Sequence, residues 1–553
     1  KGAVQVPDPF LKRVLFEATT VVLAWLRERG VPVGFKDLGA GGISCAAVEM
    51  AAAAGMGLDL DLDRESVDDP ARAAEVIACA ETQERFALIV PAAAVDSVLS
   101  IYNEDFELPA LYPGAGARDV GRILDDDRFV LRHRGAVVCD LPASVVTAGI
   151  AYERAAAPPA PRAAAPVPPG AGDDLEVDGL EETLGRMLAR PNLCSRAFIY
   201  RGYDGEVRGR AVVRPGEGDA GVIAPVPGAP FGLAMTVDGI PAYGQVDPYL
   251  AGAHAACEAM RNVVCAGAEP IALTDCLNYG NPEVPEVFGT FVAGVDGIAD
   301  AARGIGRRHD ASAPVPVVSG NVSFYNQSTK GRAVAPSPIV ACAGRLRELT
   351  AATTLRIRRP GSALLLVGRR RPELGGSEIA EALWGRRDAP LPPLDFAGER
   401  RRLYAVLDLI ESGAVLACHD IAAGGFLLAL VEMLLGERAT AALGARIEVD
   451  VARWLERPAG GRWSPPAARP LAATLFGEAP GYLLEIDAGR REAVREHLAG
   501  RGIAVDGPDG EAIWCGSVTE TAQLEIDLDG RRVTVALEPL AATLAGSLAA
   551  ALA

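Results

Sequence analysis

The sequence has 553 residues, a formal net charge of −18 and a pI near 4.9. This acidic balance argues against duplex nucleic acid or an anionic membrane as a partner, and the length is enough for roughly three or four domains. The ten cysteines include no CxxC pair, so neither a zinc site nor a redox motif is indicated. With no signal peptide or long apolar span in view, we expect a soluble, cytoplasmic protein.

The first predicted elements form a unit that recurs later in the chain. A helical stretch and the apolar strand "VPVGF" lead into "KDLGAGGISCAAVEM", residues 36–50, and a similar helix and strand lead into "HDIAAGGFLLALVEM", residues 419–433. The positions in register are Asp37 with Asp420, Gly41 with Gly424, Gly42 with Gly425, Glu49 with Glu432, Met50 with Met433 and, further on, Glu81 with Glu478. This predicts a duplicated unit of strand, Asp-containing turn and helix starting at two glycines.

A Pro- and Ala-rich stretch, "AAAPPAPRAAAPVPPGAG", separates the two copies and is typical of an extended linker. We therefore predict four parts: residues 1–154 as the C-terminal half of a first repeat, 155–178 as the linker, 179–350 as the N-terminal half of a second repeat, and 351–553 as its C-terminal half. The segment 179–350 has no counterpart before the first copy. We accordingly expect a truncated chain that lacks roughly 200 residues of the first repeat.

Two polar stretches in the third part follow apolar strands. "TDCLNYGNPE", residues 274–283, follows "PIAL", and "SGNVS", residues 319–323, follows "PVPVV". Each is predicted to be a loop at a strand end, where binding groups are common, although a solvent turn explains either one alone. Asp and Asn oxygens suit Mg²⁺, and glycine lets backbone amides approach phosphate. No Gly-Lys pair occurs, which excludes a P-loop, and for His419 beside Asp420 a structural role is favoured over catalysis.

Taken together, these motifs resemble a known family. "VQVPDPF", "KDLGAGG", "ETQERF", "TDCLNYGNPEVPEVF", "PVVSGNVSFYN" and "ELGGSE" stand in the order found in the phosphoribosylformylglycinamidine synthases. The closest likeness is to the separate-subunit form, PurL. The resemblance implies a mixed α+β and α/β fold of duplicated AIR-synthetase-like (PurM-like) N and C domains, with the first N domain missing. It also implies an ATP- and Mg²⁺-dependent ligase of purine biosynthesis, which converts formylglycinamide ribonucleotide to the amidine through an iminophosphate.

The resemblance further implies residue roles. Substrate contacts are expected from Gln5, Glu81, Thr82, Gln83 and Ser323, ATP contacts from Asp275 and Gly320, and Mg²⁺ ligation from Asp37 and Asn321. The catalytic His base of the family is expected in the missing N-terminal part, so no catalytic residue is assigned here. The alternatives are ordinary structural roles: a helix cap for Asp37 and turns for Gly320 and Ser323.

The resemblance implies that ammonia comes from a separate glutaminase subunit (PurQ-like), with a small accessory subunit (PurS-like), because no glutaminase nucleophile follows the second repeat. Alone, the truncated chain is expected to be inactive as a synthase. Two other functions stay open: a non-catalytic, nucleotide-binding fragment, and another enzyme of the AIR-synthetase superfamily. Two repeats in one chain and the "ETQER" segment argue against the latter.

Overall fold

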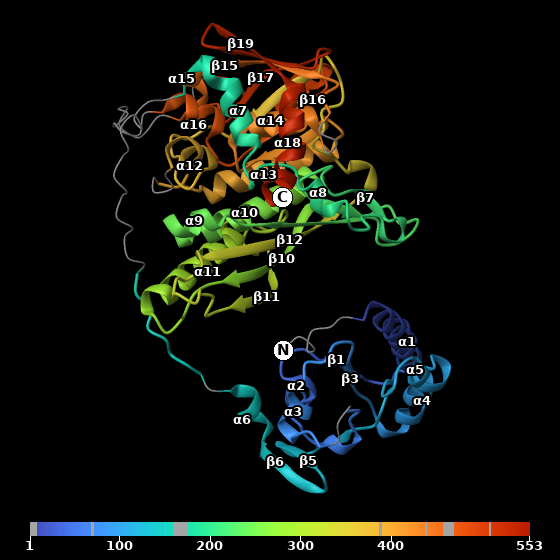
Figure 1. Cartoon of the computed structure of the whole chain (residues 1–553). Helices are drawn as coiled ribbons and strands as arrows, with labels where there is room; N and C mark the ends of the chain where they lie inside the picture. The colour runs from blue at the N-terminus through green and yellow to red at the C-terminus, as the bar shows by residue number, and fades with distance from the viewer. Residues whose placement is uncertain are drawn as a thin grey trace. The chain divides into compact units, whose positions relative to one another are not determined.

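The computed structural model describes residues 8–67, 71–149, 151–158, 175–385, 390–436, 440–456, 469–507 and 510–553. They fall into two compact units, unit 1 up to Glu153 and unit 2 from Arg154 onward (Figure 1). Among the helices described, none is both long and apolar enough to span a membrane. Gln5, a predicted substrate contact, lies outside the described residues.

Unit 1 begins with α1 (Pro9–Glu28), which the Asp8 carboxylate caps by accepting a hydrogen bond from the Leu11 N–H at 2.9 Å. The remaining principal elements are β1 (Gly34–Asp37), α2 (Gly42–Ala53), β2 (Gly57–Asp61), α3 (Ala74–Cys79), β3 (Phe86–Ile89), α4 (Val95–Ser100), α5 (Leu108–Leu111), β4 (Gly121–Leu124), β5 (Arg128–His133), β6 (Ala136–Pro142) and α6 (Ala143–Ala148). The strands form two separate sheets, β1-β3 and β4-β2-β5-β6. One hydrophobic cluster surrounds α2, and another joins α1 to α4.

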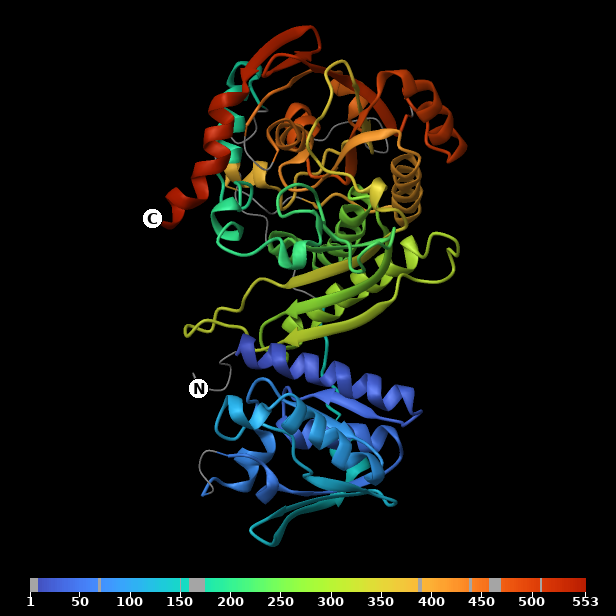
Figure 2. The ribbon, with the colours of Figure 1, turned by 90° about the vertical axis from the view of Figure 1, so that its right-hand side faces the viewer.

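Unit 2 starts with two helices, α7 (Leu180–Leu188) and α8 (Ala197–Tyr200), and a six-stranded sheet of order β11-β10-β12-β9-β8-β7. The strands are β7 (Ala211–Val213), β8 (Gly221–Ile223), β9 (Gly232–Asp238), β10 (Glu269–Asn278), β11 (Val317–Ser323) and β12 (Ser337–Leu346). The helices between them are α9 (Pro241–Val246), α10 (Pro248–Cys265) and α11 (Pro285–Ile305). Helix α10 packs on the sheet and against α11 (Figure 2).

The second half of unit 2 is built on a seven-stranded sheet, β14-β16-β13-β17-β15-β18-β19. Its strands are β13 (Ala363–Val367), β14 (Val415–Ile421), β15 (Gly444–Val449), β16 (Gly481–Ile486), β17 (Ala512–Thr519), β18 (Gln523–Leu528) and β19 (Arg531–Ala536). Its helices are α12 (Glu378–Trp384), α13 (Phe396–Glu411), α14 (Gly425–Leu435), α15 (Val451–Trp454), α16 (Pro470–Phe476), α17 (Arg491–Gly500) and α18 (Leu537–Leu552). Helices α7 and α8, from the range predicted as the start of the N-terminal half, pack against α18 in this second half.

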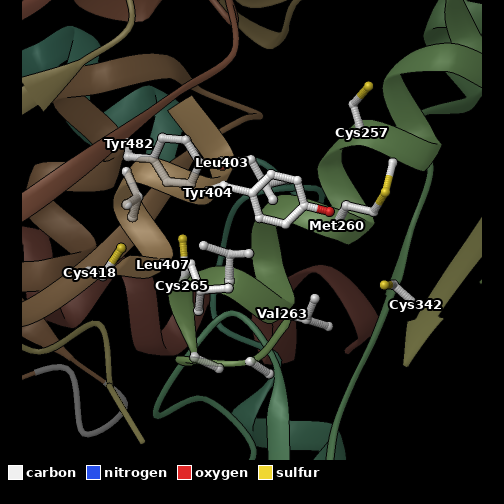
Figure 3. Close-up of a cluster of buried hydrophobic side chains, with 14 of the residues drawn as sticks. Cys257, Met260, Val263, Cys265, Cys342, Leu403, Tyr404, Leu407, Cys418 and Tyr482 are labelled. Atoms are coloured by element: carbon white, nitrogen blue, oxygen red, sulfur yellow. The ribbon is translucent and has the colours of Figure 1, made fainter. Parts of the chain in front are cut away.

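A single hydrophobic cluster joins the two halves of unit 2. Met260 and Cys265 of α10 lie opposite Leu407 of α13, Cys418 of β14 and Tyr482 of β16 (Figure 3). All five side chains are at most 1% exposed. Because α10 belongs to the first half and the other three elements to the second, the two halves share one core.

The strand assignments correct three details of the sequence-based prediction. Asp37 is the last residue of β1, and Asp420 lies inside β14, so neither is in a turn. Asp275 lies within β10, and Gly320, Asn321 and Ser323 lie within β11, not in loops. Strand β10 continues through its polar residues because β11 and β12 pair with its backbone on both sides. The turn formers that end it are further on, from Gly280 to Pro282.

Candidate functional site

Four predicted site residues come together on two neighbouring strands of unit 2. Strands β10 and β11 are parallel, and their register places Asp275 beside Gly320, Cys276 beside Asn321, and Asn278 beside Ser323. A Cβ on Gly320 would lie only 2.5 Å from the Asp275 Oδ1. The absence of a side chain at residue 320 therefore leaves the space that the Asp275 carboxylate uses.

Asp275 and Asn321 supply carboxylate and amide oxygens, hard donors of the kind that bind a divalent cation. Burial raises the pKa of Asp275, and a backbone hydrogen bond from Asn321 partly offsets that rise. Asn321 is exposed on β11, the edge strand of the sheet. The Asn326 amide donates hydrogen bonds to the backbone carbonyls of Tyr279 (3.1 Å) and Ser323 (2.8 Å), which fixes the end of β11 against β10.

The other predicted residues that the structure describes, Asp37, Glu81, Thr82 and Gln83, lie at one end of unit 1. Asp37 is exposed at the end of β1, and the next residue, Leu38, donates its N–H to the Arg85 carbonyl at 3.1 Å. The Glu81–Arg85 segment therefore runs beside the end of β1. Within it, Thr82 is exposed and the Gln83 side chain donates to the Glu81 carbonyl at 3.2 Å. These groups and the β10–β11 group belong to different units.

The close packing at this end of unit 1 depends on Gly42. Its φ is +58°, in the left-handed region, and a Cβ there would lie 2.6 Å from the Ala80 carbonyl oxygen. The start of α2 can therefore approach the residues that immediately precede Glu81. An ion pair between Lys36 and Glu49 joins β1 to α2 beside Asp37.

In unit 2 the equivalent positions form a buried polar network, which the sequence analysis did not predict. Arg261 of α10 lies 3.6 Å from the Asp420 Oδ2 and 3.5 Å from the Glu399 Oε2. His419 contacts Asp219 through Nδ1 (2.8 Å) and Glu432 through Nε2 (3.1 Å). The one available signal was an arginine inside the otherwise apolar run "AMRNVV".

Glu478, the counterpart of Glu81, is also buried. Its Oε1 accepts hydrogen bonds from the N–H groups of Glu378 and Gly424, both at 2.9 Å, and its Oε2 accepts one from the Tyr243 hydroxyl at 3.1 Å. Burial raises the pKa of Glu478 to about 7. Among the described residues of unit 1, Asp37 is exposed and Glu81 partly exposed, whereas Arg261 and Tyr243 cover their counterparts in unit 2.

The cluster of Asp219, His419 and Asp420 could in principle surround a cation, because their ligand atoms lie within 4.8 Å of one another. Burial alone would lower the pKa of His419, but the Asp219 and Glu432 carboxylates raise it well above its usual value. Without a bound cation the ring is therefore favoured as an imidazolium. The cluster fits a structural role for His419, as an ion-pair network between the halves of unit 2.

The chain resembles PurL proteins in sequence. It is 46% identical over 433 residues to the phosphoribosylformylglycinamidine synthase subunit PurL of Methanothrix thermoacetophila, covering 78% of this chain and 55% of that protein. It is 38% identical over 434 residues to the same subunit from Thermomicrobium roseum, covering 78% and 56%. The chain thus spans a little more than half the length of these curated relatives.

Solved structures share the fold. The structure of Thermotoga maritima PurL complexed with ATP matches with a TM-score of 0.58 at 18% identity, over 94% of this chain and 68% of that one. The structure of the same protein complexed with FGAR gives 0.58 at 18% identity, over 93% and 65%. At this identity the likeness establishes the mixed α/β fold.

Family models match both halves of the predicted repeat. The N-terminal domain of AIR synthase related proteins matches residues 217–346. The C-terminal domain matches twice, at residues 1–133 and 359–511, which confirms the predicted duplication. The chain therefore belongs to the family of AIR synthase related proteins.

Proposed function

We propose that this chain acts in purine biosynthesis as a PurL-type phosphoribosylformylglycinamidine synthase. The observation that carries the proposal is the 46% identity over 433 residues to a protein of that name. The reaction converts formylglycinamide ribonucleotide (FGAR) to the amidine: ATP phosphorylates the formamide oxygen, and ammonia then displaces phosphate. The cytoplasm is the proposed location.

ATP is proposed to bind at the β10–β11 group. Asp275 and Gly320 contact the nucleotide, and Asn321 ligates Mg²⁺. The side-chain oxygen of Asn321 is a hard donor on an exposed strand edge, as this metal prefers. The exposed Asp37 carboxylate of unit 1 is proposed as a second Mg²⁺ ligand. Mg²⁺, when bound, neutralises charge on the transferring phosphoryl group. A related protein supports ATP as the ligand, because Thermotoga maritima PurL was solved with ATP.

FGAR is proposed to contact Glu81, Thr82, Gln83 and Ser323, together with Gln5. These groups supply carboxylate, hydroxyl and amide functions that can bind ribose hydroxyls and the formamide. Thermotoga maritima PurL was also solved with FGAR and, as PurLQS, in an assembly. By analogy, ammonia is proposed to come from a separate PurQ-like glutaminase, assisted by a PurS-like accessory subunit.

The function is tested with the complete gene product. With FGAR, ATP, Mg²⁺ and ammonium, it should form the amidine and ADP in equal amounts, and glutamine should replace ammonium only when a glutaminase is added. FGAR-independent ATP hydrolysis as the only activity would contradict the assignment.

The ATP site is tested on the present chain by titration calorimetry with Mg·ATP. Asp275→Ala should weaken binding at least tenfold, because it removes a partly buried carboxylate from the site. Asp296→Ala, which changes an exposed carboxylate on α11, is the matched control and should bind like the wild type. Equal affinity for both variants would remove Asp275 from the nucleotide site.

A further inference from the structure

Asn326 joins the ends of the two strands that carry the proposed nucleotide site. Its side-chain amide donates hydrogen bonds to the backbone carbonyls of Tyr279, one residue past the end of β10, at 3.1 Å and of Ser323, the last residue of β11, at 2.8 Å. Its own N–H donates to the same Tyr279 carbonyl at 3.2 Å. One residue thus connects the two strands beyond the last pair of their ladder, Asn278 with Ser323.

Backbone hydrogen bonds make the same connection. The Tyr279 N–H donates to the Ser323 carbonyl at 2.9 Å, and the Tyr325 N–H donates to the Gly280 carbonyl at 2.9 Å. The chain therefore turns back after β11 and runs beside the residues that follow β10. Both carbonyls that the Asn326 amide reaches already accept a backbone N–H, so the amide fixes the turn rather than satisfying a lone acceptor.

The turn holds Tyr325 in a strained conformation. Its φ is +58°, in the left-handed region that residues with a side chain rarely adopt. Tyr325 is 51% exposed, and its hydroxyl donates to the Glu283 carboxylate at 3.1 Å. Packing does not explain a strained residue whose side chain lies largely at the surface. Strain of this kind is typical of sites where the backbone must hold functional groups in place.

The Asn326 amide also faces the hydroxyl of Ser323, the residue proposed to contact FGAR. The hydroxyl lies 3.0 Å from Nδ2, which can donate to it, and 3.2 Å from Oδ1, which can accept its proton. A hydroxyl has one hydrogen to donate and two lone pairs. Whichever of the two atoms it bonds, Asn326 orients the hydroxyl and leaves it a further hydrogen-bonding function for a ligand.

This hydroxyl lies close to the proposed Mg²⁺ ligand. Residues 321 and 323 of β11 are on the same face of the sheet, because side chains alternate along a strand. Two residue rises separate them, which is roughly 7 Å. Asn321 is exposed and Ser323 partly exposed. A ligand at this edge of the sheet can therefore contact both side chains.

We propose that Asn326 is a positioning residue for FGAR, acting through the Ser323 hydroxyl. The inference rests on the proposed function, which assigns a substrate contact to Ser323. Asn326 fixes the end of β11 against the chain that follows β10 and orients the hydroxyl on the face that carries Asn321. A ribose hydroxyl or the formamide group of FGAR then binds a serine side chain that is already ordered, which lowers the entropic cost of binding.

A double-mutant cycle on the complete gene product tests this proposal, with the dissociation constant of FGAR measured by titration calorimetry. Ser323→Ala and Asn326→Ala should each weaken binding about tenfold, and the double variant should bind little more weakly than either. A residue that acts only on the fold would add its own effect to that of Ser323→Ala, for a loss of about a hundredfold. Asn326→Asp keeps the shape but replaces the donating group by an acceptor, so it should bind as weakly as Asn326→Ala.

Hydrogen exchange of the present chain separates the two parts of the role. Asn326→Ala should speed exchange of the Tyr279 and Tyr325 amides about fivefold, because the turn loses its side-chain hydrogen bonds. Ser323→Ala should leave this exchange slow, since the Asn326 amide still reaches both carbonyls. Thr329→Ala, at an exposed residue further along the same turn, is the control and should change neither the exchange nor the FGAR affinity.

The wild type decides the proposed function before any variant is compared. A wild type that does not bind FGAR would contradict both that function and this inference. With a wild type that binds, three results would overturn the inference and leave the function standing: an unchanged FGAR affinity in Asn326→Ala, effects that multiply in the cycle, or amide exchange that Asn326→Ala does not alter.

Discussion

Glu478 shows how the covering layer of unit 2 changes a single carboxyl group. It is 4% exposed and accepts two backbone hydrogen bonds, yet burial dominates and raises its pKa to about 7. Its counterpart Glu81 is partly exposed. The same position thus holds a poorly ionised group in one repeat and a solvent-accessible carboxylate in the other, which favours unit 1 for binding a cation or a polar substrate.

The first prediction concerns the pH dependence of stability. Because the folded-state pKa of Glu478 is about 7 and the unfolded value about 4.5, the native state binds more protons between these pH values. Its contribution is therefore greatest below about pH 4.5 and is lost as the pH rises to about 7. In Glu478→Gln, the amide oxygen still accepts from Glu378 and Gly424. Relative to the wild type, the variant should gain about 2 kcal/mol of unfolding free energy from pH 5 to 7.5.

Denaturant unfolding of both proteins, followed by the fluorescence of the unit 2 tryptophans, measures this difference. Subtracting one pH profile from the other removes the contribution of His254, whose pKa burial lowers to about 4 and which acts in the opposite direction. Parallel profiles for the two proteins would mean that Glu478 ionises normally in the folded state.

A second prediction tests Arg261, which is 1% exposed and supplies positive charge between Glu399 and Asp420. Arg261→Met should cost about 3–5 kcal/mol at pH 8, because Asp420 is left buried without its cation. Arg303→Met is the control: this arginine is paired with Asp300 on the exposed face of α11, and its loss should change stability by less than about 1 kcal/mol. Equal effects in urea unfolding would show that the buried ion pair is no more important than an exposed one.

At the scale of elements, the start of α14 depends on two glycines in the left-handed region. Gly424 has a φ of +86°, and Gly425 a φ of +75°; a Cβ on Gly425 would lie 2.4 Å from the backbone carbon of Phe476. Gly41 and Gly42 repeat this arrangement at the start of α2, with φ of +76° and +58°. The glycine pair is therefore what lets each helix begin against the segment that carries Glu81 or Glu478.

The third prediction follows from that contact. Gly425→Ala should destabilise unit 2 by at least about 2 kcal/mol, from left-handed strain together with the clash against the Phe476 backbone. Gly546→Ala, in the middle of α18 with no neighbour near its Cβ position, should instead stabilise by about 0.5–1 kcal/mol. Thermal unfolding of the two variants distinguishes the signs, and a neutral Gly425→Ala would contradict the packing argument.

The sequence revealed the parts of the fold that repeat or that lie close together along the chain. The Asp–Gly-Gly–Glu spacing predicted the duplicated domain because the same residues form the start of the corresponding helix in each copy. The residues of β10 and β11 that we propose for the site were predicted to lie in loops because of their polarity, since the pairing of β10 on both sides was not visible in the sequence. The partners of Arg261, Glu399 and Asp420, are distant from it in sequence, so the apolar run around the arginine could indicate a buried charge but not its partners.

At the scale of the whole molecule, one face of the six-stranded sheet carries exposed apolar side chains among the described residues of unit 2. Residues that alternate along β9 illustrate it: Ala234 and Thr236 are buried beneath α10, while Met235 and Val237 are 61% and 67% exposed. Ile223 of β8, at 46%, and the partly exposed Ile339 and Ala341 of β12 extend this open face in register with β9. A continuous exposed apolar surface of this kind marks an interaction site.

The last prediction is that this open face causes the chain to associate with itself. Val237→Lys places a charge at the centre of the face, and because the side chain is already exposed, folding should be unaffected. The variant should weaken association at least tenfold in sedimentation velocity over a range of concentrations. Val207→Lys, at a similarly exposed valine (64%) outside the sheet, is the control and should associate like the wild type. If the two lysine variants associate equally strongly, the open face is not the contact. If only Val237→Lys remains monomeric, the chain associates through the exposed face of the six-stranded sheet. The same face of a second copy is then the expected partner, because two sheets can pack face to face.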